Sequence, residues 1–217
     1  MKLYYVVGSP NCRKVHAVMN HLGINVEIEY LDFLAGDLKT TEYHDLNPNG
    51  MVPTLRDGDF LLWESNAIMQ YLAANAPPNT LFPKDERTRA DITRWQCWEL
   101  AHYNKAFGAL SFETVAKPNF MNLPPDEGVV AWATRDLARH APTLEAHLKG
   151  RDFLVGNDIT LADYSVIHVE GFKEAIPFDW SPFPNINAYY GRMRAVPHWA
   201  STAPSDPKLI GRRPKAD

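Results

Sequence analysis

The sequence predicts a small α/β domain at the N-terminal end of the chain, followed by an all-helical domain. Three observations lead to this prediction. Strand-like and helix-like patterns alternate over the first third of the chain, a proline-rich stretch then interrupts them, and only helical patterns follow. The predicted domains are therefore residues 1–76 and 87–217, joined by a linker at 77–86.

The first predicted elements form a strand–helix–strand unit. Residues 3–7 are mainly β-branched and aromatic, which is typical of a strand. Residues 11–22 carry apolar side chains at helical spacing, and Gly23 after them is a common helix end. Residues 26–31 alternate apolar and acidic side chains, which predicts a strand with one buried face.

The next elements complete a small sheet. Residues 34–47 are polar and predict either a helix or a loop, and residues 51–55 predict a strand. Asp57-Gly58-Asp59 predicts a hairpin turn into another strand at 60–63. Ser65 is a favourable N-cap for the helix that follows. This order combines a parallel strand pair with an antiparallel hairpin.

Residues 87–217 show only helical patterns. Long patterns run over 87–114 and 125–148, and a shorter helix is predicted after Pro184. Between them, Thr160-Leu161-Ala162-Asp163 is a variant of the capping box that precedes an apolar run. The C-terminal domain is therefore predicted to be all-α.

The composition is that of a globular protein and argues against several function classes. Hydrophobic residues make up 45% of the 217 residues, and the net charge of −4 gives no electrostatic support for nucleic-acid binding. No apolar stretch is long enough to span a membrane. Two cysteines far apart in sequence predict no disulfide framework and a cytoplasmic location. The histidines show no metal-ligand spacing, so no metal is expected.

A hydroxyl and a thiol are three positions apart in Ser9-Pro10-Asn11-Cys12, where the first helix is predicted to begin. Serine followed by proline is a favourable N-cap, which is a sufficient structural reason for Ser9. The same place puts the hydroxyl at the positive end of the helix dipole, where a thiolate is stabilised. Cys12 falls on the apolar stripe, which favours burial, although Ser-x-x-Cys also resembles a redox Cys-x-x-Cys without its first thiol.

Two further segments have both a structural and a functional interpretation. Pro53 is either an ordinary proline at a strand start or, with a cis bond after Val52, part of an edge that pairs with a peptide-like ligand. Glu64 is either an acid beside the helix cap Ser65 or the partner of a ligand ammonium. Ser65 and the adjacent amides would then bind the ligand's carboxylate.

The chain resembles the cytosolic glutathione transferases over nearly its whole length. The matching segments are Ser-x-x-Cys-Arg-x-Val at 9–15, Asn-Pro-x-Gly-x-Val-Pro-x-Leu at 47–55 and Glu-Ser-x-Ala-Ile at 64–68. In the helical half, Leu-Val-Gly at 154–156 leads into Thr-Leu-Ala-Asp at 160–163. Among the classes of that family, the first turn is similar to that of bacterial, theta-like or related serine-type enzymes.

The resemblance implies a thioredoxin-like N-terminal domain that binds glutathione, and an all-α C-terminal domain that shapes the pocket for an electrophile. Ser9 resembles the serine whose hydroxyl donates to the glutathione sulfur, with Cys12 and Asn11 as alternatives. The implied activity is transfer of glutathione to hydrophobic electrophiles, as in detoxification. The fold of this family usually forms a homodimer.

The remaining ligand contacts also follow from the resemblance. Val52 with cis-Pro53 would pair with the cysteinyl backbone, and Glu64 with Ser65 would bind the γ-glutamyl end. Met51 stands where related classes often carry a polar ligand contact. Either Lys39 or His44 would bind the glycine carboxylate. Tyr103 and Phe107 would line the electrophile pocket.

Two other functions stay open at this stage. One is a glutathione-dependent thiol–disulfide reductase that uses Cys12. The other is a non-catalytic interaction module that keeps the glutathione transferase fold. Glu64 and Ser65 argue against the second, because a scaffold has no need of an anchor for a γ-glutamyl group.

Overall fold

The computed structural model describes residues 1–214, and the last residues of the predicted helical domain, 215–217, lie outside the described part. The chain divides into two compact units. The first comprises Met1–Phe82 together with the segment that begins at Val196, and the second comprises Pro83–Ala195.

The first unit is built on a four-stranded sheet with the order β2-β1-β3-β4. Strand β1 (Lys2–Tyr5) pairs in parallel with β2 (Glu27–Tyr30) and antiparallel with β3 (Thr54–Asp57). Strand β4 (Phe60–Trp63) continues the sheet as the second arm of the hairpin. This mixed sheet confirms the parallel pair and the hairpin that the sequence predicted.

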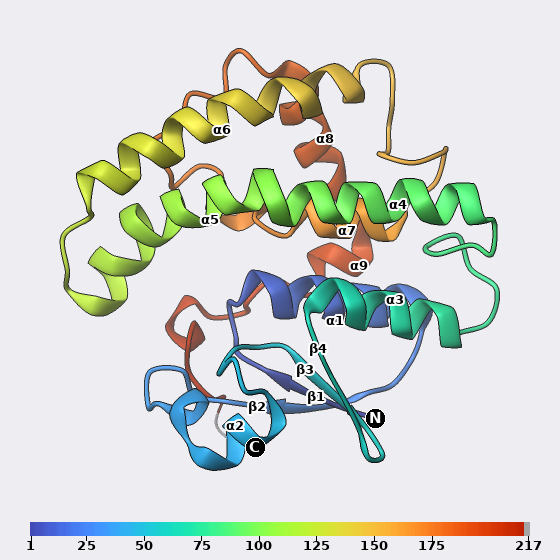
Figure 1. The fold of residues 1–217 in the computed structure, drawn as a ribbon, viewed down its shortest axis with the longest axis vertical. Helices are drawn as coiled ribbons and strands as arrows, with labels where there is room; N and C mark the ends of the chain where they lie inside the picture. The colour runs from blue at the N-terminus through green and yellow to red at the C-terminus, as the bar shows by residue number, and fades with distance from the viewer. Residues whose placement is uncertain (215–217) are drawn as a thin grey trace. The chain divides into compact units, whose positions relative to one another are not determined.

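Helices cover both faces of this sheet. Helices α1 (Pro10–Leu22) and α3 (Ser65–Asn75) lie side by side on one face, and α2 (Thr41–Leu46) lies on the other, after a 3₁₀ turn at Asp37–Lys39 (Figure 1). The core side chains beneath α1 and α3 are fully buried, and each contributes about 1.5–3 kcal/mol by leaving water. They include Leu3, Val15, Leu55, Ile68 and Met69.

The thioredoxin-like order of the sheet places three chain segments at one of its ends. Helix α1 begins just after β1, the 47–53 loop runs into β3, and α3 begins just after β4. The strand predicted at 51–55 begins only at Thr54, because Pro53 has no N–H for the ladder. Residues 51–53 are therefore left as loop beside the starts of both helices.

The C-terminal segment belongs to the first unit, whereas the sequence grouped it with the helical domain. Trp199 in α9 (Pro197–Ala200) is buried, and the Arg13 guanidinium lies 3.9 Å from its ring centroid. Arg13 Nε also donates to Thr202 Oγ1 at 3.2 Å. These contacts attach α9 to α1, and the helical unit ends at Ala195.

The second unit is helical. Helix α4 (Glu86–Trp98) continues through a π-helical turn (Glu99–Tyr103) into α5 (Asn104–Ser111) and a second π-helical segment (Phe112–Met121). Helices α6 (Glu127–Leu148), α7 (Leu161–Ile167) and α8 (Pro184–Arg194) follow, with a 3₁₀ turn at Glu170–Phe172. The first long helix extends beyond the predicted end near residue 114, and the other predicted helices are confirmed.

The predicted capping box at the start of α7 is present. Thr160 N–H donates to Asp163 Oδ2 at 2.8 Å, and the Thr160 hydroxyl donates to the same oxygen. Asp163 is fully buried and also accepts from Leu154 N–H at 2.9 Å and Tyr189 O–H at 3.0 Å. One carboxylate thus joins the 154–160 loop, α7 and α8.

Candidate functional site

Ser9 is the N-cap of α1, as its sequence context predicted. Its φ and ψ of −67° and 120° are extended, and its Oγ accepts from Cys12 N–H at 3.4 Å. Pro10 occupies the first helical position, where its missing N–H costs nothing. Ser9 Oγ acts as the acceptor in this contact, which does not use the hydroxyl's own proton.

The turn before Ser9 is held by the C-terminal segment. Gly8 has a φ of +83°, and a Cβ at this position would lie 2.8 Å from Ile210 Cγ2. Gly211 N–H donates to Val7 C=O at 2.9 Å. Contacts more than 200 residues apart in the sequence therefore fix the backbone that presents Ser9.

Cys12 faces the core of the first unit. Its side chain is fully buried, and this burial raises the pKa of the Cys12 thiol to about 12, against the weaker lowering effect of hydrogen bonds with Ser9 and Val6. A thiol with such a pKa stays protonated at neutral pH, and the protonated form is a poor nucleophile. Of the two interpretations of Cys12, its environment favours the structural one.

We expect only one of the two cysteines to react in the folded protein. Cys97 is exposed, whereas Cys12 is buried and protonated. Titration with a chromogenic aromatic disulfide should therefore release about one equivalent of dye before denaturation and about two after it. A Cys97→Ala variant that still releases dye rapidly when folded would contradict this expectation.

A small pocket lies where α1, the 47–53 loop and α3 meet. Its volume is about 70 Å³, well below the roughly 300–1,000 Å³ of a typical small-molecule pocket, so it suits the end of a ligand rather than a whole tripeptide. The residues that line it are Asn11, Asn47, Asn49, Met51, Val52, Pro53, Glu64 and Ser65. Four of the residues singled out from the sequence for the peptide edge and the γ-glutamyl end are therefore neighbours.

The loop side of the pocket is held by side chains that the sequence reasoning did not select. Asn47 is 2% exposed, and its Nδ2 donates to Met51 C=O at 2.8 Å and to Thr54 Oγ1 at 3.1 Å. Tyr43 O–H also donates to Met51 C=O, at 2.6 Å. The Asn-Pro-x-Gly spacing contained Asn47, but a buried amide could not be distinguished there from an ordinary turn residue.

The peptide bond between Val52 and Pro53 is cis. Within residues 1–214, no hydrogen bond to the backbone N–H or C=O of Val52 is found. Both groups belong to a residue of the pocket wall and have the hydrogen-bonding capacity to pair with an extended peptide. The cis bond is the condition that the functional interpretation of residues 51–55 set, and pairing with a ligand stays a prediction.

Glu64 has an unusual backbone conformation for a residue with a side chain. Its φ and ψ are 70° and 109°, and non-glycine residues at positive φ concentrate at functional sites because the strain must have a compensating use. This conformation turns the chain from β4 into α3, so that Glu64 precedes Ser65, the first residue of the helix. Ser65 is 5% exposed, and the first amides of α3 have no partner within the helix.

The two candidates for the glycine carboxylate lie outside the pocket lining. Lys39 and His44 are both exposed. His44 adjoins the 47–53 loop, since a Cβ on Gly50 would lie 3.1 Å from its Cε1. Both remain predictions.

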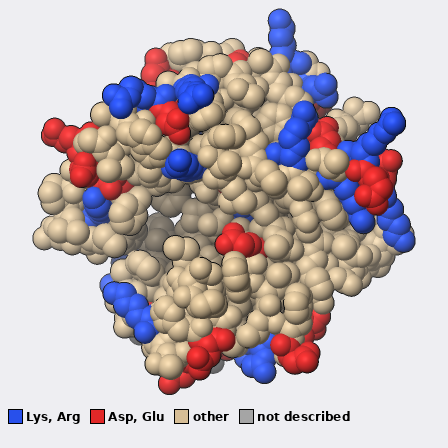
Figure 2. Space-filling model, viewed as in Figure 1, with Lys and Arg blue, Asp and Glu red and all other residues tan. Residues whose placement is uncertain are grey.

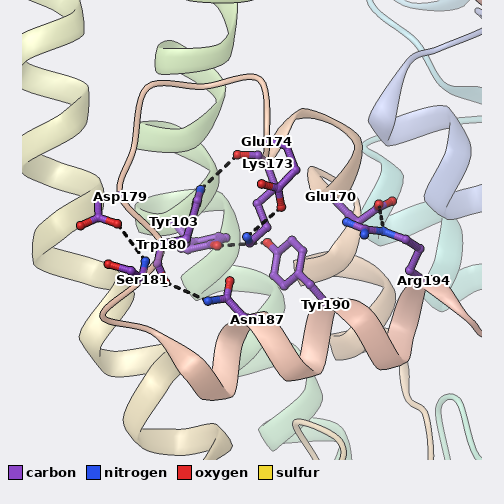
Figure 3. Close-up of polar contacts among 10 residues, drawn as sticks. All are labelled: Tyr103, Glu170, Lys173, Glu174, Asp179, Trp180, Ser181, Asn187, Tyr190 and Arg194. Atoms are coloured by element: carbon purple, nitrogen blue, oxygen red, sulfur yellow. Dashed lines mark hydrogen bonds and ion pairs between the residues drawn. The ribbon is translucent and has the colours of Figure 1, made fainter.

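Tyr103 and Phe107, the candidates for the electrophile pocket, lie in the core of the helical unit, which argues against that assignment. Both side chains are fully buried, and Tyr103 O–H is 3.0 Å from Tyr190 O–H (Figure 3). Burial also raises the pKa of Tyr103 far above its ordinary value. Phe107 packs against Trp180 with ring centroids 6.0 Å apart. Their i, i+4 spacing predicted a shared helix face correctly, but that face packs inward.

Three further features concern the surface charge, metal ligands and helix hydrophobicity of the described residues. On the face shown in Figure 2, basic and acidic side chains are interspersed. Within the described residues, no three His, Cys, Asp or Glu side chains are grouped as metal ligands. No described helix is both long enough and apolar enough to cross a membrane.

Comparisons with known proteins give consistent matches. Residues 3–80 match the family model "Glutathione S-transferase, N-terminal domain", and residues 109–197 match "Glutathione S-transferase, C-terminal domain". A rice protein named "Probable glutathione S-transferase GSTF2" is 36% identical over 203 residues, covering 91% of this chain and 93% of that protein.

Two solved structures share the fold. Glutathione transferase F7 from Populus trichocarpa has a TM-score of 0.84 at 22% identity, covering 93% of this chain and 96% of that one, which establishes the fold alone. A theta-class glutathione S-transferase from Xanthomonas axonopodis pv. citri, solved with glutathione bound, has a TM-score of 0.83 at 28% identity. It covers 94% of this chain and 97% of its own.

Proposed function

Because the chain belongs to the glutathione S-transferase family, we propose that its first unit binds glutathione across the pocket, with Ser9 beside the sulfur. The protein is an enzyme of this class, and it transfers glutathione to an electrophile. In the proposed arrangement, Glu64 and Ser65 bind the γ-glutamyl end, and the Val52 backbone pairs with the cysteinyl residue. His44 or Lys39 meets the glycine carboxylate.

The observation that carries the proposal is the grouping of Val52, Glu64 and Ser65 in one pocket at the start of α1. A zwitterionic amino-acid end needs an anion for its ammonium and donors for its carboxylate. Glu64 supplies the first, and the α3 N-terminus supplies the second. The γ-glutamyl end of glutathione has this chemistry.

The chemical step needs an ionised sulfur held near an electrophilic carbon. The Ser9 O–H donates a hydrogen bond to the thiolate, which lowers the thiol pKa because the hydrogen bond favours the charged form. The sulfur lone pair then forms the new S–C bond. In a substitution the leaving group departs with its bonding electrons, and in a conjugate addition the resulting carbanion takes a proton from solvent. Catalysis consists mainly of pKa lowering and positioning.

Conjugation of glutathione to 1-chloro-2,4-dinitrobenzene, followed by absorbance, tests the function directly. We expect saturable dependence on glutathione and release of chloride. Failure to bind glutathione at millimolar concentration would instead favour the non-catalytic module. Reductase activity through Cys12 is disfavoured by its burial and high pKa, and a Cys12→Ala variant should conjugate within about twofold of the wild-type rate.

We further infer a serine-type class, on the position of Ser9 at the start of α1. Three of the curated relatives, from rice, maize and Hyoscyamus muticus, are plant proteins and give no support to a bacterial, theta-like assignment. A homodimer, a cytoplasmic location, a role in detoxification and a reaction without metal belong to the same proposal. Size-exclusion chromatography with light scattering tests the first of these.

Substitutions of Glu64 should separate ligand binding from backbone strain. We expect Glu64→Gln to raise the KM for glutathione at least tenfold with little change in stability, because it loses a charge-assisted contact and keeps the positive φ. Glu64→Gly should raise KM similarly. It should also leave the free energy of unfolding unchanged or raise it by up to about 2 kcal/mol, because relief of strain exceeds the entropy cost of glycine.

Steady-state kinetics and urea unfolding measure these two effects. An unchanged KM in Glu64→Gln would remove Glu64 from the ligand site. A marked loss of stability in Glu64→Gly would show that the conformation of Glu64 is not strained.

A further inference from the structure

Asn11 joins the start of α1 to the start of α3. It is the second residue of α1, and its Oδ1 accepts a hydrogen bond from Ser65 O–H at 3.2 Å. Asn11 also lines the same pocket as Glu64 and Ser65, whereas Ser9 is not part of that lining. The side chain of Asn11 therefore faces the end of the site assigned to the γ-glutamyl group.

The three asparagines of the pocket differ in which atoms of their side-chain amides already form hydrogen bonds. Asn47 uses its Nδ2 on Met51 C=O and Thr54 Oγ1, and its Oδ1 accepts from Asn49 N–H and Asn49 Nδ2, both at 3.0 Å. Both polar groups of Asn47 and the Nδ2 of Asn49 are thus engaged within the loop. In the part of the chain that the structure describes, the Nδ2 of Asn11 has no such partner.

The contact with Ser65 fixes which end of the Asn11 amide meets a ligand. The Ser65 hydroxyl donates to Asn11 Oδ1, so the amide oxygen already has a partner. The NH₂ group is therefore the part of the amide that can bind a ligand. An NH₂ group can only donate, and of the two charged groups of an amino-acid end only the carboxylate accepts. Glu64 is the pocket's counterpart for the ammonium.

We propose that Asn11 is a specificity-determining residue whose side-chain NH₂ donates to the α-carboxylate of the γ-glutamyl group. This inference rests on the proposed function, and it assigns Asn11 to the γ-glutamyl end rather than to the sulfur. Asn11 and the first amides of α3 together hold the carboxylate, while Ser65 sets the orientation of the Asn11 amide. A thiol that lacks the γ-glutamyl group leaves these donors unpaired and binds weakly for that reason.

Binding of S-methylglutathione measured by calorimetry tests the proposal, because this ligand keeps the γ-glutamyl end and has no ionisable thiol. We expect Asn11→Ala to weaken binding about tenfold, and Asn11→Asp to weaken it more, since Asp repels the carboxylate. Asn20→Asp adds the same charge on α1 outside the pocket and should bind like the wild type. Thermal unfolding of each variant identifies any that are misfolded.

The thiol pKa of bound glutathione supplies a second measurement. It distinguishes a contact of Asn11 with the carboxylate from a contact with the sulfur, because only the second affects ionisation of the thiol. We expect this pKa to stay near the wild-type value in folded Asn11→Ala. A raised thiol pKa with unchanged S-methylglutathione affinity would place Asn11 at the sulfur and overturn the proposal. Equal affinity of Asn11→Ala, Asn11→Asp and wild type would overturn it too. If the wild-type protein itself fails to bind S-methylglutathione, the proposed function fails together with it.

Discussion

Replacing Asp163 by alanine is expected to lower the free energy of unfolding by about 3–5 kcal/mol, because it removes a buried carboxylate and leaves its donors unpaired. Those donors are the backbone N–H groups of Leu154 and Thr160 and the Tyr189 hydroxyl, all within 3.0 Å. All three lie in the helical unit, so α7, α8 and the loop before them lose a common acceptor. Urea unfolding followed by circular dichroism measures the loss.

Asp85 offers a matched control for this substitution. It is the N-cap of α4 and accepts from Thr88 N–H at 2.8 Å, so it also satisfies a free amide at a helix start, but it is exposed. Asp85→Ala should therefore cost only about 1 kcal/mol, which is typical of an exposed cap. Equal losses in Asp85→Ala and Asp163→Ala would show that burial of the Asp163 network adds nothing beyond capping.

The same carboxyl should make stability depend on pH. Burial raises the pKa of Asp163 from 3.8 to about 6 against the opposing effect of its hydrogen bonds. Because the folded state binds this proton more tightly than the unfolded state, the contribution is present below pH 3.8 and is lost as the pH rises to about 6. The stability of the wild type relative to Asp163→Asn should fall over this interval, and a rise would contradict the assignment.

Replacing Ser9 by alanine is expected to raise the pKa of the bound glutathione thiol by one to two units, toward the value of about 8.5 for a free cysteine thiol. A single charge-assisted hydrogen bond contributes about 1.5–3 kcal/mol, and each pKa unit corresponds to about 1.4 kcal/mol. At neutral pH the smaller thiolate fraction should reduce kcat/KM about 10- to 100-fold. Ultraviolet absorbance of the thiolate, titrated with pH, measures the shift.

The structural role of Ser9 has to be separated from this effect. Loss of the N-cap should cost about 1 kcal/mol of stability, which leaves the variant folded. Ser9→Thr keeps a hydroxyl for both roles and should retain most of the activity. An unchanged thiol pKa in folded Ser9→Ala would move the sulfur contact to another group.

Local sequence signals were sufficient where a residue's role depends on its neighbours in the chain. Three features depend only on groups within a few residues of one another. They are the N-cap Ser9, the capping box of Thr160 and Asp163, and the hairpin at Gly58. The periodicity of apolar residues also predicted most helices and the mixed sheet. The Glu64-Ser65 pair was found in the same way, because the sequence indicates a helix start there, although the N-cap is Glu64 and not the predicted Ser65, which is the first residue of α3.

Only the tertiary structure decided which way ambiguous faces point. Cys12 and Tyr103 carried both a chemical and a packing interpretation, and both side chains are fully buried. Periodicity identifies a face that prefers contact with other groups, but it does not distinguish a core from a pocket, because both are apolar. Burial depends on segments distant in sequence, so it cannot be derived from local spacing.

By itself, the sequence determined the order of most strands and helices, the N-cap of α1, the capping box of α7 and the candidate residues at the starts of α1 and α3. The tertiary structure decided that residues 196–214 belong with the first unit and that Asn11 meets Ser65. The physical reason is the range of the interactions. Caps and turns are satisfied by groups within one helical turn, whereas an inter-helix hydrogen bond over 54 positions exists only once the sheet has brought its ends together.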